Sequence, residues 1–248
     1  MTRARLLPFC LLPFSIVPFA SFAQSNVRSL SMLDNSDTVS VHRLSIPEKA
    51  RKAYNEGVRR LNAEDWNASV AKFQRAIRLF PAFFEAYNQL GNADLGLQSW
   101  NDAEAAFRES IELSGGAFAA PHFGFGLVLS HRNQFADAEA MIRQGLALSP
   151  EDARGNFCLA WVLYSMGQLA EAEQSAREAI VYNPAFPEPY LLLAQIDLVR
   201  RSFSAEIQDL NGYLELDSSS PRSARARAAR ADALHALAAE NATARVIP

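Results

Sequence analysis

An internal repeat constrains this chain more than any other feature of its sequence. Small residues recur through its middle at intervals of 34, 35, 34 and 34 residues, at Gly57, Gly91, Gly126, Ala160 and Ala194. Three further series keep the same intervals, and they begin at Trp66, Ser69 and Phe73. Periods of this length are typical of proteins built from stacked supersecondary units. The sequence therefore predicts five copies of one unit, between about residues 50 and 220.

Each series has a physical role in a unit made of two packed α-helices. Small residues on both helices let the two backbones approach closely. On the second helix these residues are Ser69, Ala103, Ala138 and Ala172, with Glu206 breaking the rule in the fifth copy. One helical turn further along the same face is the series Phe73, Phe107, Ile142, Ala176 and Leu210. The bulky residues expected to fill the turn of the hairpin are Trp66, Trp100, Phe135, Leu169 and Phe203.

Proline closes most of the units. Pro81, Pro150 and Pro184 recur where the second helix must stop, because the proline ring cannot continue the helical hydrogen bonds. Units two and five have Gly115 and Ser218 there instead. The single inserted residue falls in residues 114–116, a turn between two units, where extra chain length costs little.

This pattern resembles the tetratricopeptide repeat, whose unit of about 34 residues has an early Leu-Gly, a central Ala, a Phe and a closing Pro. The matching residues are Gly57, Phe73, Ala76 and Pro81 in unit one, Leu90, Gly91, Ala103 and Phe107 in unit two, Phe125, Gly126, Ala138 and Pro150 in unit three, and Leu159, Ala160, Ala172, Ala179 and Pro184 in unit four. Unit five is degraded and keeps Leu193 and Ala194. The resemblance implies an all-α protein, a right-handed α-solenoid of about five helical hairpins, that binds other proteins.

The first residues have the layout of a secretory signal peptide. Arg3 and Arg5 supply positive charge, residues 6–20 are almost wholly apolar, and Ser21-Phe22-Ala23 has small residues where a signal peptidase cuts. The apolar run is too short for a membrane-spanning helix, which needs about 20 residues. We expect cleavage after Ala23, no integral membrane span in the mature chain, and export to the periplasm or the medium. A retained signal that anchors the protein is the alternative.

The segments beside the repeats complete the predicted organisation. Serine-rich residues 24–44 are expected to be a flexible linker, and a capping box formed by Ser45 and Glu48 predicts that the first helix opens at Ser45. An Ala-rich helix is expected to cap the last unit, because stacked repeats must cover their final apolar face. The predicted segments are the signal peptide 1–23, the linker, the solenoid 45–240 with units at about 50–83, 84–118, 119–152, 153–186 and 187–220 and a capping helix at 221–240, and a tail at 241–248.

The resemblance also indicates where a partner would bind. In the family, the first helices line a concave wall that takes an extended peptide or a helix of a partner, and the second, fifth, ninth and twelfth places of each unit face it. The candidate groove residues at these places are Tyr54, Asn88, Asn92, Phe123, Leu127, Phe157, Trp161, Tyr164 and Gln195. Aromatic side chains dominate binding hot spots, and the amides of Asn88 and Asn92 share a helix face.

Two questions about this wall stay open. Phe123 and Phe157 fit packing between repeats as well as they fit the groove, whereas Trp161 and Tyr164 are favoured as groove residues. Chaperone-binding members of the family grip a C-terminal carboxylate with lysine and asparagine. Tyr54, Val58 and Gln89 occupy such places here, which argues against that clamp. We therefore expect a peptide with apolar or aromatic side chains.

The sequence contains no recognisable catalytic pattern. The four histidines lack the spacing of paired metal ligands, and Cys158 is the only cysteine after the signal peptide. A net charge of −3 gives no general attraction to nucleic acid. We expect a non-catalytic interaction scaffold without metal or cofactor. The alternatives are a structural solenoid that self-associates in an envelope complex and, less favoured, a hydrolytic enzyme.

Overall fold

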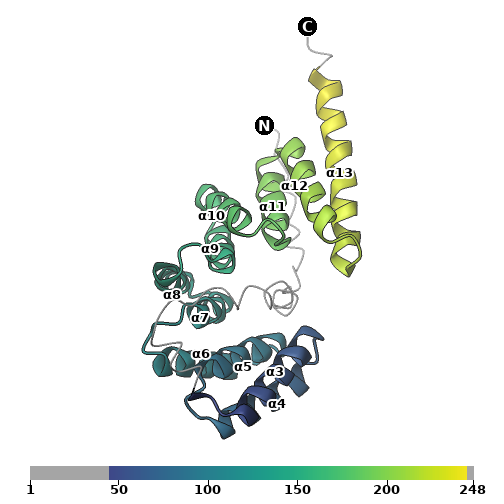
Figure 1. Cartoon of the computed structure of the whole chain (residues 1–248). Helices are drawn as coiled ribbons and strands as arrows, with labels where there is room; N and C mark the ends of the chain where they lie inside the picture. The colour runs from purple at the N-terminus through teal and green to yellow at the C-terminus, as the bar shows by residue number, and fades with distance from the viewer. Residues whose placement is uncertain (1–44, 245–248) are drawn as a thin grey trace.

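A computed structural model describes residues 45–244, which form eleven α-helices and no strand. The first ten pair as hairpins: α3 (Glu48–Asn62) with α4 (Trp66–Leu79), α5 (Phe84–Gly96) with α6 (Trp100–Leu113), α7 (Ala120–His131) with α8 (Phe135–Leu148), α9 (Ala153–Ser165) with α10 (Leu169–Tyr182), and α11 (Glu188–Arg200) with α12 (Phe203–Leu216). The last helix is α13 (Pro221–Ala244), which runs past the predicted end at residue 240. The predicted all-α solenoid of five hairpins and a terminal helix is confirmed (Figure 1).

The predictions for the first 44 residues lie outside the part of the chain that the structure describes. They comprise the signal peptide, its cleavage after Ala23 and the linker at residues 24–44. The same holds for the last four residues of the predicted tail.

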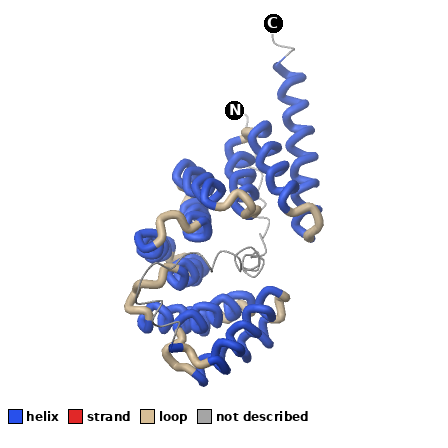
Figure 2. Tube along the Cα trace, in the orientation of Figure 1, coloured by secondary structure: helices blue, strands red, loops and turns tan. Residues whose placement is uncertain are grey.

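The hairpins stack into an arc, and their first helices line its inner side (Figure 1). Each of α3, α5, α7 and α9 packs against the first helix of the next unit. Within the described residues, the second helices make no comparable contact with one another and pack on the following first helix instead. Helices that lie closer together mark the concave side of a curved stack. Short loops join the helices along the edges of the arc (Figure 2).

The repeated small residues hold the two helices of a hairpin together. A Cβ atom on Gly57 would lie 2.6 Å from the ring of Phe73, and one on Gly91 would lie 2.7 Å from the ring of Phe107. These glycines therefore leave room for a fully buried ring on the second helix. In unit four, alanine takes both the glycine place and the phenylalanine place. Ala160 on the first helix and Ala176 on the second helix are both fully buried.

Large residues also connect consecutive units. The ring of Phe107 fills the space that a Cβ atom on Gly124 of α7 would need, so this side chain touches its own unit and the next one. Trp66 does the same at the first junction, where a Cβ atom on Gly96 would lie 2.7 Å from its indole. The inserted residue between units two and three lies in a turn with positive φ at Gly115 and Gly116, 61° and 76°. Glycine adopts such angles without steric cost.

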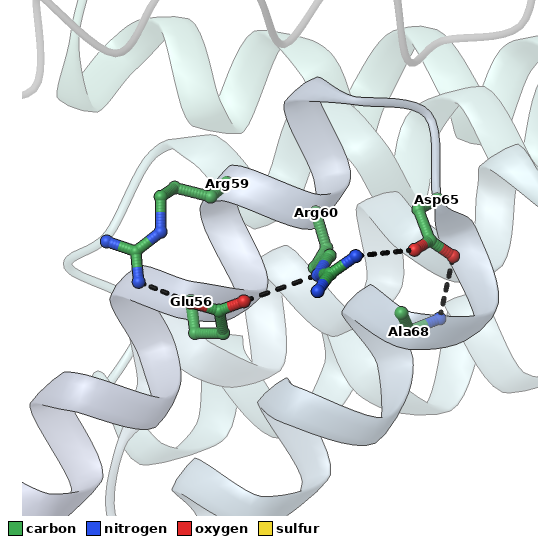
Figure 3. A network of polar contacts seen from close by, with 5 residues as sticks. All are labelled: Glu56, Arg59, Arg60, Asp65 and Ala68. Atoms are coloured by element: carbon green, nitrogen blue, oxygen red, sulfur yellow. Dashed lines mark hydrogen bonds and ion pairs between the residues drawn. The ribbon is translucent and has the colours of Figure 1, made fainter.

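The helix starts differ in how they are capped. The predicted capping box at Ser45 is wrong, because α3 begins at Glu48 and its N-cap is Pro47, with φ −57° and ψ 140°. A residue that precedes proline is disfavoured in helical conformation, so Ile46 separates Ser45 from the helix. Asp65 caps α4 by accepting a hydrogen bond of 3.3 Å from the backbone N–H of Ala68 (Figure 3).

A buried carboxyl group interrupts the apolar packing of unit two. Asp94 is 6% exposed at the eleventh place of its unit, where units three and four have Leu129 and Leu163. Burial, with the nearby negative charge of Asp102, raises the pKa of Asp94 to about 7. The folded protein therefore binds this proton more tightly than the unfolded chain does, and stability falls as the pH rises from about 4 to about 7.

Replacing Asp94 with leucine is expected to stabilise the protein at pH 8 by about 2 kcal/mol, because the variant buries no carboxylate. Urea unfolding of both proteins at pH 8 and pH 5 measures the difference. The gain should shrink at pH 5, where the wild-type carboxyl is protonated in the folded state. A gain that is equal at both pH values would show that Asp94 is not the cause.

Unit five is the least regular, as its sequence indicated. Glu206 is 3% exposed at the place where units one to four have fully buried small residues, and its Oε2 has no hydrogen-bond partner. Burial, together with Asp197 and Asp232, raises the pKa of Glu206. A carboxyl group at this packing position weakens the contact between the two helices of unit five.

Candidate partner-binding groove

All nine predicted groove residues lie on the first helices, which line the inner side of the arc (Figure 1). The common period of the repeat places them there, because equivalent residues of successive units face the same way. They differ in how deeply the neighbouring helices bury them. This depth divides them into a core group and a surface group.

Three of the nine residues pack against other parts of the stack: Phe123 between units three and four, and Tyr54 and Phe157 against phenylalanines at the ends of their own units. Phe123 is 3% exposed, and Cβ atoms on Gly145 and Gly155 would each lie 2.5 Å from its ring. Tyr54 is half-buried, with its ring centroid 4.9 Å from that of Phe83. The half-buried ring of Phe157 meets Phe186 edge-on at 5.3 Å. Of the two placements open for Phe123, the structure shows the inter-repeat core.

Amide groups form the polar part of the wall on α5. The Nδ2 of Asn92 donates a hydrogen bond of 3.0 Å to Oε1 of Gln89. Asn88 is 3% exposed, and its Oδ1 has no partner, so its amide is not available at the surface beside Asn92 as expected. Gln89 is itself buried, at 8% exposure, so the accessible amide at this end of the groove is that of the half-buried Asn92.

An aromatic pair forms the apolar part of the wall on α9. Trp161 and Tyr164 are both half-buried, and their ring centroids lie 6.3 Å apart. Burial raises the pKa of Tyr164, so its hydroxyl remains a neutral donor and acceptor at physiological pH. Leu127 on α7 and Gln195 on α11 are half-buried on the same inner side. Together these four residues form a surface that is mainly apolar and rich in aromatic area.

The residue indexing also identifies one inner residue that the sequence prediction left out. This residue is Leu198, at the twelfth place of unit five, which is 52% exposed, and Val199 beside it is 53% exposed. The same numbering that selects Tyr164 in unit four selects Leu198 in unit five. Only the structure shows that Leu198 is exposed, because the corresponding leucines of units one and two, Leu61 and Leu95, are buried.

Partly exposed ion pairs join neighbouring units. Glu173 accepts hydrogen bonds from Arg177 of its own helix and from Arg200 of the next unit, and these bonds lower its pKa. Glu104 joins Arg108 and Arg132 in the same way between units two and three. Such side chains are partly exposed, so they contribute more to geometry than to stability.

Cys158 and the histidines on α7, residue types that often act as nucleophiles, bases or metal ligands, are packed against other groups of the protein. Cys158 is fully buried, and burial raises the pKa of its thiol far above the physiological range. Burial lowers the pKa of His122, whose Nδ1 lies 3.1 Å from the carbonyl oxygen of Phe118. His131 stacks on Trp100 with ring centroids 3.6 Å apart. Across residues 45–244, no cluster of three or more metal-ligating side chains is present.

The helices also differ from membrane-spanning segments. Along the described part of the chain, none of them combines the length and the apolar character that crossing a bilayer requires.

Models of the tetratricopeptide repeat match two parts of the sequence, residues 48–118 and residues 129–196. Together the two matches span more than half of the chain. A search of curated protein sequences gave no match.

Solved structures share the architecture. TTC0263, described as a thermophilic TPR protein in Thermus thermophilus, is 18% identical, with a TM-score of 0.66 over 75% of this chain and 98% of its own. PilW, described as a type IV pilus biogenesis factor, is 16% identical, with a TM-score of 0.62 over 81% of this chain and 96% of its own. The Cut9–Hcn1 structure is 18% identical, with a TM-score of 0.70 over 90% of this chain and 44% of that one. At such identities the likeness concerns the fold alone.

Proposed function

The chain belongs to the tetratricopeptide repeat family, and from this premise we propose that it is an exported scaffold that binds a polypeptide segment of a partner in its concave groove. Members of the family bind protein partners and are generally not catalysts. The observation that carries the proposal is the half-buried aromatic pair, Trp161 and Tyr164, on the inner wall of the arc. Large aromatic side chains that remain accessible in a concave surface are the residues that anchor partners.

The side chains of the wall indicate what kind of partner it would bind. The half-buried amide of Asn92, which Gln89 holds by a hydrogen bond, suits a peptide backbone, which has a donor and an acceptor at every non-proline residue. Trp161, Tyr164 and Leu127 suit apolar and aromatic side chains. The expected ligand is therefore an extended segment with apolar side chains, held through its backbone near unit two and through its side chains near unit four. A C-terminal carboxylate is not required for this recognition.

Selection from a library of displayed random peptides tests this function. The immobilised chain, residues 24–248, is expected to enrich sequences with aromatic or aliphatic residues, with dissociation constants in the micromolar range. The matched control is the Tyr164→Ala/Trp161→Ala protein, which should not enrich them. If both proteins enriched the same peptides equally, the groove would not be the binding surface.

Export is a separate part of the proposal and rests on the layout of residues 1–23. The protein isolated from its native cells is expected to begin at Gln24 and to be found outside the cytoplasm. N-terminal sequencing of that material after fractionation measures both points. A protein that still begins at its first residue would contradict cleavage.

A further inference from the structure

Three carboxyl groups lie within the α11–α12 hairpin of unit five. Asp197 on α11 is 6% exposed, Glu206 on α12 is 3% exposed, and Asp209, one turn further along α12, is half-buried. Oδ2 of Asp197 and Oε2 of Glu206 have no hydrogen-bond partner among the described residues. Buried polar atoms are normally paired, so an ionised carboxylate at either place destabilises the hairpin.

A hydrogen bond between two of these carboxyl groups joins the helices, from Asp197 on α11 to Asp209 on α12. An ionised carboxylate only accepts hydrogen bonds, so this bond forms only when one member of the pair is protonated. Two ionised carboxylates at hydrogen-bonding distance would repel each other instead. The contact between the two helices therefore depends on a shared proton.

The helices around the pair supply charges of both signs. The charged groups that act on it or on Glu206 are Glu173 and Arg177 on α10, Arg200 on α11 and Asp232 on α13. Both arginines are already hydrogen-bonded to Glu173, so neither is free to neutralise Asp197. The one charge on α9, Arg154, lies in the first turn of that helix, whereas Asp197 lies in the last turn of α11.

The balance of these effects favours the protonated carboxyls. Burial, with the hydrogen bond to Asp197, raises the pKa of Asp209 to about 7, and burial raises the pKa values of Asp197 and Glu206 as well. The folded hairpin therefore binds protons more tightly than the unfolded chain does. The resulting stabilisation is complete below about pH 4 and is lost as the pH rises through about 7.

Unit five is the last hairpin of the stack, and this position determines what its instability can cause. It meets unit four through α11, which packs on α9 and α10, and on its other side it meets α13 (Figure 1). The stability of a repeat protein is about the sum of its units and of the interfaces between neighbours, so an end unit can open by losing one interface. Unit two also buries a carboxyl, Asp94, but it has a unit on each side and would lose two.

We propose that unit five and α13 form a pH-sensitive end of the solenoid, which opens locally far more often at pH 8 than at pH 5 while units one to four stay folded. The proton shared by Asp197 and Asp209 and the protonated form of Glu206 keep this end closed at the lower pH. Opening takes α11 away from the inner side of the arc and exposes Leu210 and Tyr213 of α12, which are buried in the closed form. The switch does not depend on what the groove binds.

Hydrogen–deuterium exchange of residues 24–248 at pH 5 and pH 8, read by mass spectrometry, tests the proposal. Protection is taken relative to the intrinsic exchange rate at each pH, so that it reports the opening of each helix. One carboxyl with a pKa of 3.8 in the unfolded chain and about 7 in the hairpin changes the opening equilibrium about 80-fold over this range. We expect the protection of α11, α12 and α13 to fall at least tenfold more than that of α7 and α8.

Variants locate the cause of the opening. Glu206→Ala/Asp209→Asn restores a small residue on α12 and provides an amide that can donate to Asp197 at every pH. Its protection in α11 to α13 is expected to change by less than about threefold between pH 5 and pH 8. Asp209→Asn alone, which alters the packing less, should remove most of the response.

Asp94→Leu is the matched control, because it removes the buried carboxyl of unit two and should keep the full response of unit five. An equal loss of protection along all the helices would overturn the proposal, since the whole stack would then respond to pH. A response that Asp209→Asn and the double variant both retain in full would also overturn it, because other groups would be responsible.

Discussion

Replacing Phe107 with alanine is expected to lower the free energy of unfolding by about 4 kcal/mol, the usual cost of removing a fully buried phenylalanine. The ring is 0% exposed and lies against Gly91 of its own hairpin and Gly124 of the next unit. Its removal therefore opens a cavity at the hairpin and at the junction at once. Neither Gly91 nor Gly124 has a side chain that could fill this space.

Urea unfolding followed by circular dichroism measures this loss, and Leu148→Ala is the control. Leu148 is 47% exposed at the end of a second helix, so its truncation should change the free energy of unfolding by about 0.5 kcal/mol or less. A Phe107→Ala protein as stable as the Leu148→Ala protein would show that units two and three do not pack through this ring.

Replacing Trp161 with alanine is expected to weaken binding of a groove-selected peptide by about 30-fold, which corresponds to about 2 kcal/mol. The indole is half-buried on α9 and lies beside Tyr164, with ring centroids 6.3 Å apart. Because Trp161 is only half-buried, the loss of stability should be much smaller than for Phe107.

Isothermal titration of the peptide into both proteins measures the change. Leu148→Ala, on the outer helix α8, should bind the peptide as the wild type does. Unchanged affinity of the Trp161→Ala protein, with its fold intact by circular dichroism, would place the peptide elsewhere on the molecule.

The sequence alone was enough to predict the fold. Small and large residues that recur at a common period require equivalent structures, and the close approach of Gly57 to Phe73 and of Gly91 to Phe107 shows the physical basis of that recurrence. Propensity and periodicity also locate the helices closely. The capping box at Ser45 was the exception, because the effect of Pro47 on the residue before it outweighed the favourable spacing.

The sequence predicted which helices carry the groove residues, but not how deeply each side chain is buried. Indexing by place correctly puts Tyr54, Phe123 and Trp161 on inner helices. Their burial depends on which side chains of the adjacent unit lie next to them, and those contacts differ from one junction to the next. Phe123 is enclosed because Gly145 and Gly155 make room for its ring, a long-range relation that a single-unit pattern does not contain.

The terminal helix illustrates the same limit. Its existence was predictable, because the last unit has an apolar face to cover. Alanine is distributed all around α13, so its sequence does not define which neighbour it will pack on. The structure shows it along α12, and this arrangement leaves Leu198 and Val199 exposed.

The central claim is that the concave wall binds a polypeptide segment, and site-specific photo-cross-linking tests it most directly. A photoreactive phenylalanine is placed at Gln195 on the inner helix α11 in one protein and at Leu148 on the outer helix α8 in another. Each protein is irradiated with the selected peptide. We predict cross-linking from position 195 and none from position 148, whereas efficient cross-linking from 148 alone would contradict the account.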